Sequence, residues 1–211
     1  RDTEHQNISE AVRAARSSDV TIAFVGGSSA RDFETKFKET GAAVTDDSII
    51  SDMESGEGFD RASLDLMGLQ NELLAALKAT GKPLVVVYIE GRPLEKNWAK
   101  ENADALLTQF YPGQAGGEAI ADVLFGDYNP AGRLPVTFYA STDQLPDYKD
   151  YSMDGRTYRY FKGQPLYAFG YGLSYTSFSY GKGKVSGKPA SMTLSVPVTN
   201  TGAKDGDEVI Q

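Results

Sequence analysis

The sequence contains no cysteine and only one histidine, His5. The absence of cysteine excludes disulfides, thiolate nucleophiles and cysteine-ligated zinc. A lone histidine near the N-terminus is poorly suited to a Ser-His-Asp site or to a histidine metal centre, so we expect no metal. Acid–base chemistry in this chain is therefore left to carboxylates, lysine and tyrosine.

Basic residues are outnumbered: 21 Lys and Arg stand against 29 Asp and Glu, which gives a net charge of −8. Phosphate recognition needs a basic surface, so we expect no nucleic-acid partner. Apolar runs are also short, and none approaches the ~20 residues of a membrane-spanning helix. We therefore expect no membrane insertion.

Short apolar segments alternate with helical patterns through the first two thirds of the chain. The expected strands are residues 20–25, 84–89 and 105–110, and the expected helices are 7–18, 69–77, 93–101 and 118–124. This order predicts an α/β fold with a mostly parallel open sheet flanked by helices, an α/β sandwich. Such sheets bind ligands at loops that leave the carboxyl ends of their strands, and the loop after Val25 is one of these.

That loop, residues 28–66, is irregular and rich in charge, and a segment of this length in a compact domain is usually functional or disordered. Within it, Glu57 lies between Gly56 and Gly58, and small neighbours let a ligand approach the backbone closely. Phe59 could exclude water and raise a carboxyl pKa. From the residues alone, a catalytic carboxylate and an ordinary solvated acidic loop both remain open. A nucleotide site is excluded because neither phosphate-binding glycine fingerprint is present.

The character of the chain changes near residue 182. Residues 182–189 are typical of a linker, and the alternation over 192–198 predicts a half-buried strand. A turn at 200–202 would lead to a second strand at 208–211, which together are typical of the first hairpin of an all-β domain. We expect two domains, 1–181 and 182–211, within a longer protein, because the chain starts inside a helical pattern and stops inside a strand pattern.

Five groups of motifs stand out in the sequence: residues 57–61 with Leu64, Leu66 and Gln70; 80–87 with 91–94; 111–114 with Gly116 and Gly117; 121–126 with 129–135; and 158–161 with 169–175. In their order and spacing they resemble the second, α/β-sandwich domain of family 3 glycoside hydrolases, the β-glucosidases and β-xylosidases. The resemblance covers about residues 18–181. Residues 190–211 resemble the start of the fibronectin-III-like domain that often follows.

The resemblance implies a retaining exo-β-glycosidase that releases glucosyl or xylosyl residues from an oligosaccharide or β-glycoside without a cofactor. Its general acid/base would be Glu57, four residues before Arg61, with Glu54 as the alternative. The nucleophile would be an Asp on an N-terminal TIM-barrel domain of the same parent chain, and no barrel or nucleophile motif is present here. We therefore expect the isolated chain to be inactive, and a periplasmic or secreted location for the enzyme.

Further site residues are expected from the chemistry of their side chains. Arg31 and Asp32, after the first expected strand, would line the sugar site because charged groups suit sugar hydroxyls. Asp60 and Arg61 would pair and support the acidic loop. Trp98, the sole tryptophan, is expected to pack in the core rather than to stack on a sugar. The alternative function is a noncatalytic carbohydrate-binding or scaffold module with the same fold.

Overall fold

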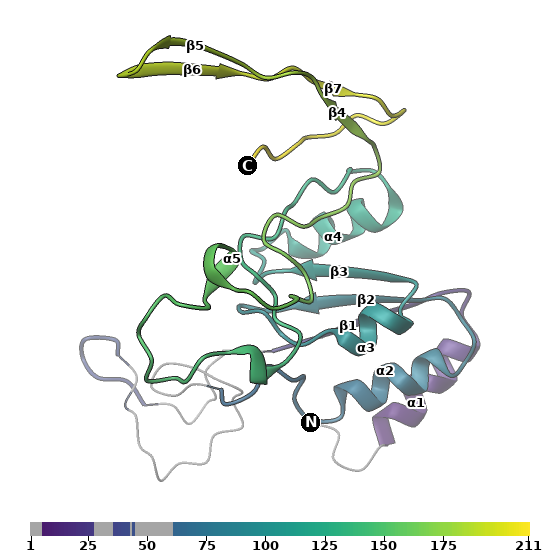
Figure 1. Cartoon of the computed structure of the whole chain (residues 1–211). Helices are drawn as coiled ribbons and strands as arrows, with labels where there is room; N and C mark the ends of the chain where they lie inside the picture. Colours follow the sequence, from purple (N-terminus) through teal and green to yellow (C-terminus); the bar gives the residue numbers. More distant parts are fainter. Residues whose placement is uncertain (1–5, 28–35, 43, 45–60) are drawn as a thin grey trace. The chain divides into compact units, whose positions relative to one another are not determined.

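The computed structural model describes residues 6–27, 36–42, 44 and 61–211 (Figure 1). Contacts within the chain divide it into two compact units. The first comprises Arg1–Pro112 and Thr137–Tyr167, and the second comprises Gly113–Val136 and Ala168–Gln211. The second unit draws on both sides of the predicted domain boundary at 181/182, which stays a prediction.

The first unit is built on a parallel sheet of three strands in the order β1-β2-β3. Its elements are α1 Gln6–Arg16, β1 Thr21–Gly26, α2 Gln70–Lys78, β2 Leu84–Ile89, α3 Asn97–Asn102 and β3 Ala105–Gln109, followed by the short helices η1 Thr142–Gln144 and α5 Thr157–Tyr160. The register joins Thr21 to Leu84 at one end and Gly26 to Ile89 at the other. The predicted α/β class, a parallel sheet with flanking helices, is confirmed.

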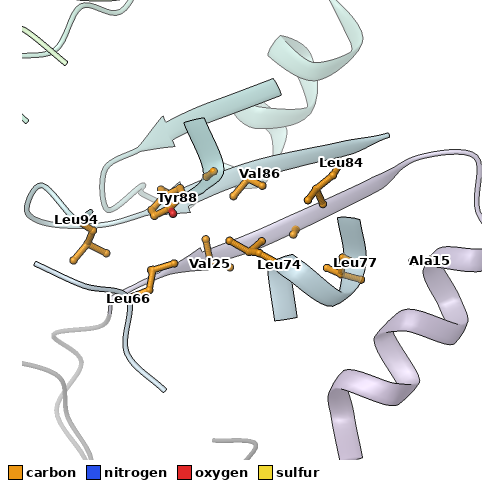
Figure 2. Close-up of a cluster of buried hydrophobic side chains, with 11 residues drawn as sticks. Ala15, Val25, Leu66, Leu74, Leu77, Leu84, Val86, Tyr88 and Leu94 are labelled. Carbon is orange, nitrogen blue, oxygen red and sulfur yellow. The ribbon is translucent and has the colours of Figure 1, made fainter. Parts of the chain in front are cut away.

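The core of this unit lies between one face of the sheet and helices α1, α2 and α3 (Figure 2). It consists of Ala15, Ala23, Val25, Leu66, Leu74, Leu77, Leu84, Val86, Tyr88, Leu94 and Ala99. Leu74, Leu84 and Val86 have no exposed surface, and burying each such side chain contributes about 1.5–3 kcal/mol. Trp98 packs against this cluster, which confirms its predicted role in packing.

Strand β2 is apolar on both faces because it is the central strand of the sheet. Val86 on one face and Val87 on the other are both fully buried. A continuous apolar run is what a strand covered on both sides requires. The helix expected over 93–101 begins later, at Asn97, because the segment before it is held by side-chain hydrogen bonds to Glu90.

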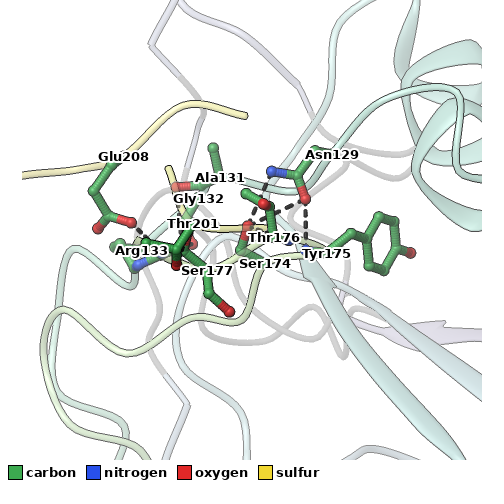
Figure 3. Close-up of polar contacts among 10 residues, drawn as sticks. All are labelled: Asn129, Ala131, Gly132, Arg133, Ser174, Tyr175, Thr176, Ser177, Thr201 and Glu208. Atoms are coloured by element: carbon green, nitrogen blue, oxygen red, sulfur yellow. Dashed lines mark hydrogen bonds and ion pairs between the residues drawn. The ribbon is translucent and has the colours of Figure 1, made fainter. Parts of the chain in front are cut away.

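The second unit contains α4 Gly116–Phe125 and the four strands β4 Phe178–Tyr180, β5 Lys184–Lys188, β6 Ser191–Ser195 and β7 Val198–Asn200. Asn129 connects two of its segments: its Nδ2 donates to Ser174 Oγ at 2.9 Å, and its Oδ1 accepts the backbone N–H of Tyr175 at 2.6 Å (Figure 3). Arg133 forms an ion pair with Glu208 at 3.3 Å. The Asn-Pro turn is thus tied to the last third of the chain.

The C-terminal strands correct three expectations. Residues 184–188, expected as linker, form β5, which pairs antiparallel with β6, and Val185 lies opposite Leu194. The strand expected over 192–198 is two strands with Pro197 between them, since proline cannot donate to a ladder. It is also exposed rather than half-buried, with Leu194 68% exposed, and residues 208–211 form no strand.

Candidate functional site

The carboxyl ends of β1, β2 and β3 lie at one edge of the parallel sheet, where ligands of such folds bind. Residues 28–60, which carry all but one of the predicted site residues, directly follow the end of β1 in the sequence, and Arg61 comes next. Of those residues, Glu57, Glu54, Arg31, Asp32 and Asp60 lie outside the described residues. The geometry below is therefore that of the sheet edge from which the segment departs.

Gly26 closes β1 in a conformation that only glycine accepts. Its φ is +146°, and a Cβ built there would lie 1.8 Å from the backbone oxygen of Ile89. This contact holds the end of β1 directly against the end of β2, and the next amide, of Gly27, donates to the same Ile89 oxygen at 3.2 Å. The departure point of the acidic segment is therefore fixed by backbone packing.

Replacing Gly26 with alanine should lower the free energy of unfolding by about 3 kcal/mol or more, because backbone strain and a backbone clash add. Gly81→Ala is the matched control: its φ is +77° and a Cβ there meets nothing within 4 Å. That variant should lose only about 1–2 kcal/mol, the cost of a left-handed conformation. Urea denaturation followed by Trp98 fluorescence measures both, and equal losses would contradict the clash.

A buried ion pair follows β2 at the same edge. Glu90 and Lys96 are 0% and 1% exposed, and Lys96 Nζ lies 2.6 Å from Glu90 Oε2. The same Glu90 oxygen accepts the Leu94 N–H at 2.9 Å, and Oε1 accepts the Thr108 hydroxyl of β3 at 3.2 Å. One carboxylate therefore closes the turn after β2 and joins it to the neighbouring strand.

The ammonium group of Lys96 is enclosed by aromatic rings. Its Nζ lies 4.3 Å from the centroid of the Tyr88 ring and 4.5 Å from that of Phe138, within the range of cation–π attraction. Burial lowers the pKa of Lys96 to about 8, and the carboxylates of Glu90 and Glu95 limit the fall. Burial beside the same carboxylates raises the pKa of Tyr88.

This pair is arranged to hold structure rather than to transfer protons. Both Glu90 oxygens accept hydrogen bonds, and Lys96 also donates to Leu94 O at 3.1 Å. Neither side chain is accessible to a substrate. Sequence analysis did not single out these two residues, although a charged residue directly after an apolar strand is a signal that could have found Glu90.

The turn after β2 also contacts the end of β3. A Cβ added to Gly91 would lie 2.3 Å from Cε2 of Tyr111, so glycine lets this ring lie directly on the backbone. The Tyr111 hydroxyl reaches across to donate to Gly27 O at 3.4 Å. All three strand ends are thereby linked at the edge of the sheet.

Arg61 is the predicted site residue that the structure describes. Its guanidinium donates to the backbone oxygen of Asp65. Burial and, next, the nearby charge of Arg92 lower the pKa of Arg61, while Asp65 opposes them. Three residues later, Leu64 O accepts the Glu95 N–H at 2.7 Å, so this segment contacts the one that follows β2. The pairing of Arg61 with Asp60 stays a prediction.

In the part of the chain that the structure describes, no three His, Cys, Asp or Glu side chains are grouped so as to hold a metal ion. Within the same residues, no helix has the length and apolar character needed to cross a bilayer.

Known proteins are similar to this chain in sequence and in fold. The model of the glycosyl hydrolase family 3 C-terminal domain matches residues 3–175. A xylan 1,4-β-xylosidase from Xylanibacter ruminicola is 52% identical over 161 residues, which cover 75% of this chain and 19% of that protein. A periplasmic β-glucosidase from Salmonella typhimurium is 40% identical over 220 residues, 97% of this chain and 26% of the relative.

Solved structures with a similar fold are also glycosidases. A β-glucosidase from Streptomyces venezuelae in complex with D-glucose superposes with a TM-score of 0.74 at 30% identity, over 94% of this chain and 24% of that one. A β-glucosidase from Kluyveromyces marxianus gives a TM-score of 0.75 at 27% identity, over 97% and 23%. The chain spans about a fifth to a quarter of the length of these proteins. Its parallel sheet, the motifs around it and this match together place the chain in glycosyl hydrolase family 3, as a C-terminal domain.

Proposed function

We propose that this chain supplies the general acid/base of a retaining exo-β-glycosidase, with Glu57 in that role and Glu54 as the alternative. One observation carries the proposal. Residues 28–60, which contain both glutamates, directly follow the carboxyl end of β1 in the sequence, and they precede a segment in which Leu64 O accepts the N–H of Glu95, after β2, at 2.7 Å. The edge at the carboxyl ends of the strands is where α/β sheets bind ligands.

The reaction needs two carboxyl groups about 5–5.5 Å apart. The acid/base first protonates the leaving-group oxygen while the nucleophile attacks the anomeric carbon, and a covalent glycosyl-enzyme forms. The same residue, now a carboxylate, then takes a proton from the water that releases the sugar. To act as an acid near neutral pH, Glu57 must have a raised pKa, which burial and the nucleophile's negative charge would provide.

The nucleophile, in this proposal, is an Asp on an N-terminal TIM-barrel domain of the longer enzyme. Support comes from the relatives, of which this chain covers only 19–26%. Arg31 and Asp32 would line the sugar site from the start of the same segment, and Asp60 and Arg61 would hold its end. No cofactor takes part in the proposed steps.

For the substrate we place non-reducing-end β-xylosides first and β-glucosides second. The relative that is 52% identical carries the name xylan 1,4-β-xylosidase, whereas the 40% identical relative is named a periplasmic β-glucosidase. The latter name also supports a periplasmic or secreted location. Residues 182–211 would begin a fibronectin-III-like domain, for which the antiparallel pair of strands β5 and β6 offers support.

Hydrolysis of 4-nitrophenyl β-xyloside and β-glucoside tests this function. The enzyme with its barrel domain should release nitrophenol with retention of configuration at the anomeric carbon, observed by NMR. The isolated 211-residue chain should show no turnover, because the nucleophile is missing. Inversion of configuration would contradict the mechanism, and sugar binding without turnover by the longer enzyme would favour the noncatalytic module.

A further inference from the structure

The segment between Gly27 and Arg61 has two stems, and one side chain joins them. The first stem is the end of β1 at Gly26, and the second runs from Arg61 to Met67, just before helix α2. Gln70, the first residue of α2, lies between the stems and bonds to both. From the sequence alone, Gln70 was identified only as one position of the motif that resembles family 3 glycoside hydrolases.

The carboxamide of Gln70 uses every hydrogen it has. Its Oε1 accepts the Gly26 N–H at 2.8 Å, and its Nε2 donates to Gly26 O at 3.0 Å and to Met67 O at 3.0 Å. Because two backbone carbonyls face the nitrogen and one N–H faces the oxygen, only an amide satisfies all three groups. In a glutamate at this position, a carboxylate oxygen would replace Nε2, and it could not donate a hydrogen bond to either carbonyl oxygen.

The second stem is fixed at further points. The Leu64 N–H donates to Thr142 Oγ1 at 3.0 Å, and Leu64 O accepts the Glu95 N–H at 2.7 Å. The Glu95 amide belongs to the segment that Glu90 and Lys96 hold after β2. The bonds of Gln70 therefore join the end of β1 to a segment that is itself held to Thr142 and to Glu95.

We propose that Gln70 is a positioning residue for the general acid/base: by bridging Gly26 and Met67 it sets the separation and direction of the two stems of the segment that carries the acid/base. This inference rests on the proposed function. It does not depend on whether Glu57 or Glu54 is the acid, because both lie between the same stems.

A change in the position of the acid/base should affect some substrates more than others, depending on the leaving group. Proton donation to the leaving group demands a heavy-atom distance of about 2.6–3.2 Å, and a shift of about 1 Å can cost about 100-fold in rate. Substrates whose leaving group departs without protonation do not depend on this distance. Loosening the stems should therefore lower the rate for poor leaving groups and spare good ones.

The test uses Gln70→Glu in the enzyme with its barrel domain. On methyl β-xyloside kcat/KM should fall by about 10- to 100-fold, and on 2,4-dinitrophenyl β-xyloside by less than about threefold. Gln70→Met, which removes the hydrogen bonds without adding charge, should show the same selectivity if Gln70→Glu does not fold. Glu57→Ala and Glu54→Ala are measured in parallel.

Asn129→Leu is the matched control, because its carboxamide also joins two separate segments of the chain. Its Nδ2 donates to Ser174 Oγ at 2.9 Å and its Oδ1 accepts the Tyr175 N–H at 2.6 Å, and both partners belong to the second unit, whereas both stems belong to the first. This variant should lower the melting temperature without changing the ratio of the two rates. A merely structural Gln70 would behave in the same way, and that result would overturn the inference.

The outcomes separate this inference from the proposed function. If one glutamate variant shows the leaving-group selectivity and the Gln70 variants share it to a smaller degree, both proposals stand. If a glutamate variant shows it and the Gln70 variants lose activity equally on both substrates, the positioning role is wrong and the function stands. If neither glutamate variant is selective, the proposed function fails, and the inference fails with it.

Discussion

In the enzyme with its barrel domain, Glu57→Ala should lower kcat/KM on methyl β-xyloside by about 10²–10⁴-fold, the usual contribution of a general acid. On 2,4-dinitrophenyl β-xyloside the first step should be nearly unaffected, since that leaving group needs no proton. The glycosyl-enzyme should then accumulate, because the base that activates water is missing. A burst of dinitrophenol followed by slow turnover, seen by stopped-flow absorbance, measures this.

Glu101→Ala serves as the matched control, since Glu101 is an exposed glutamate on α3, remote in sequence from the acidic segment. It should keep full activity on both substrates. Should Glu57→Ala behave like Glu101→Ala while Glu54→Ala gives the burst, the enzyme class is right and the assigned glutamate is wrong.

The second large effect concerns stability. Lys96→Met should lower the free energy of unfolding by about 3–5 kcal/mol, because it leaves the Glu90 carboxylate buried without its partner. The Leu94 N–H and the Thr108 hydroxyl remain as its donors and cannot neutralise the charge. Trp98, which packs against the core two residues from Lys96, reports the transition by fluorescence during urea denaturation.

Two further variants isolate the cause. Glu90→Gln combined with Lys96→Met removes both charges and should recover most of the loss, as buried pairs replaced by neutral groups often do. Lys78→Met breaks the ion pair between Lys78 and Asp104, in which the two side chains are 36% and 51% exposed. Because this pair is exposed, the variant should lower the free energy of unfolding far less than Lys96→Met does. A Lys78 variant as damaging as the Lys96 variant would contradict the role of burial.

The same pair predicts a pH dependence with a definite sign. The pKa of Lys96 is about 8 in the fold, against an ordinary value of 10.5, so above pH 8 the unfolded chain binds more protons than the folded chain. Stability from this group therefore rises as pH increases from about 8 towards 10.5. Relative to the double variant, the wild-type chain should gain stability between pH 8 and 9.5, and a falling difference would contradict the account.

Periodicity predicted the helices and strands of the first unit well. The strand expected over 84–89 is the central strand of the sheet. The start of α3 was placed too early because its true start depends on Leu94 and Lys96 bonding to Glu90, contacts that no local pattern encodes. The hairpin at 184–195 was missed in part because its lysine and glycine content is typical of a linker.

The site was predictable only where residues match a motif. Gln70 was visible as a motif position, yet its bonds to Gly26, 44 residues away in sequence, required the fold. Gly26 ends β1, and only its contact with Ile89 explains why glycine is needed there. Long-range contacts of this kind leave no periodic pattern in the sequence, so they become visible only in the folded structure.

The central claim is that the acid/base lies on this domain, and azide tests it most directly. Glu57→Ala in the enzyme with its barrel domain, given 2,4-dinitrophenyl β-xyloside and sodium azide, should regain turnover and form β-xylosyl azide, identified by NMR. Azide needs no general base, so it attacks the glycosyl-enzyme from the face that the missing carboxylate vacated. An α-xylosyl azide would instead mark Glu57 as the nucleophile, and no acceleration with either Glu57→Ala or Glu54→Ala would contradict the assignment of the acid/base to this domain.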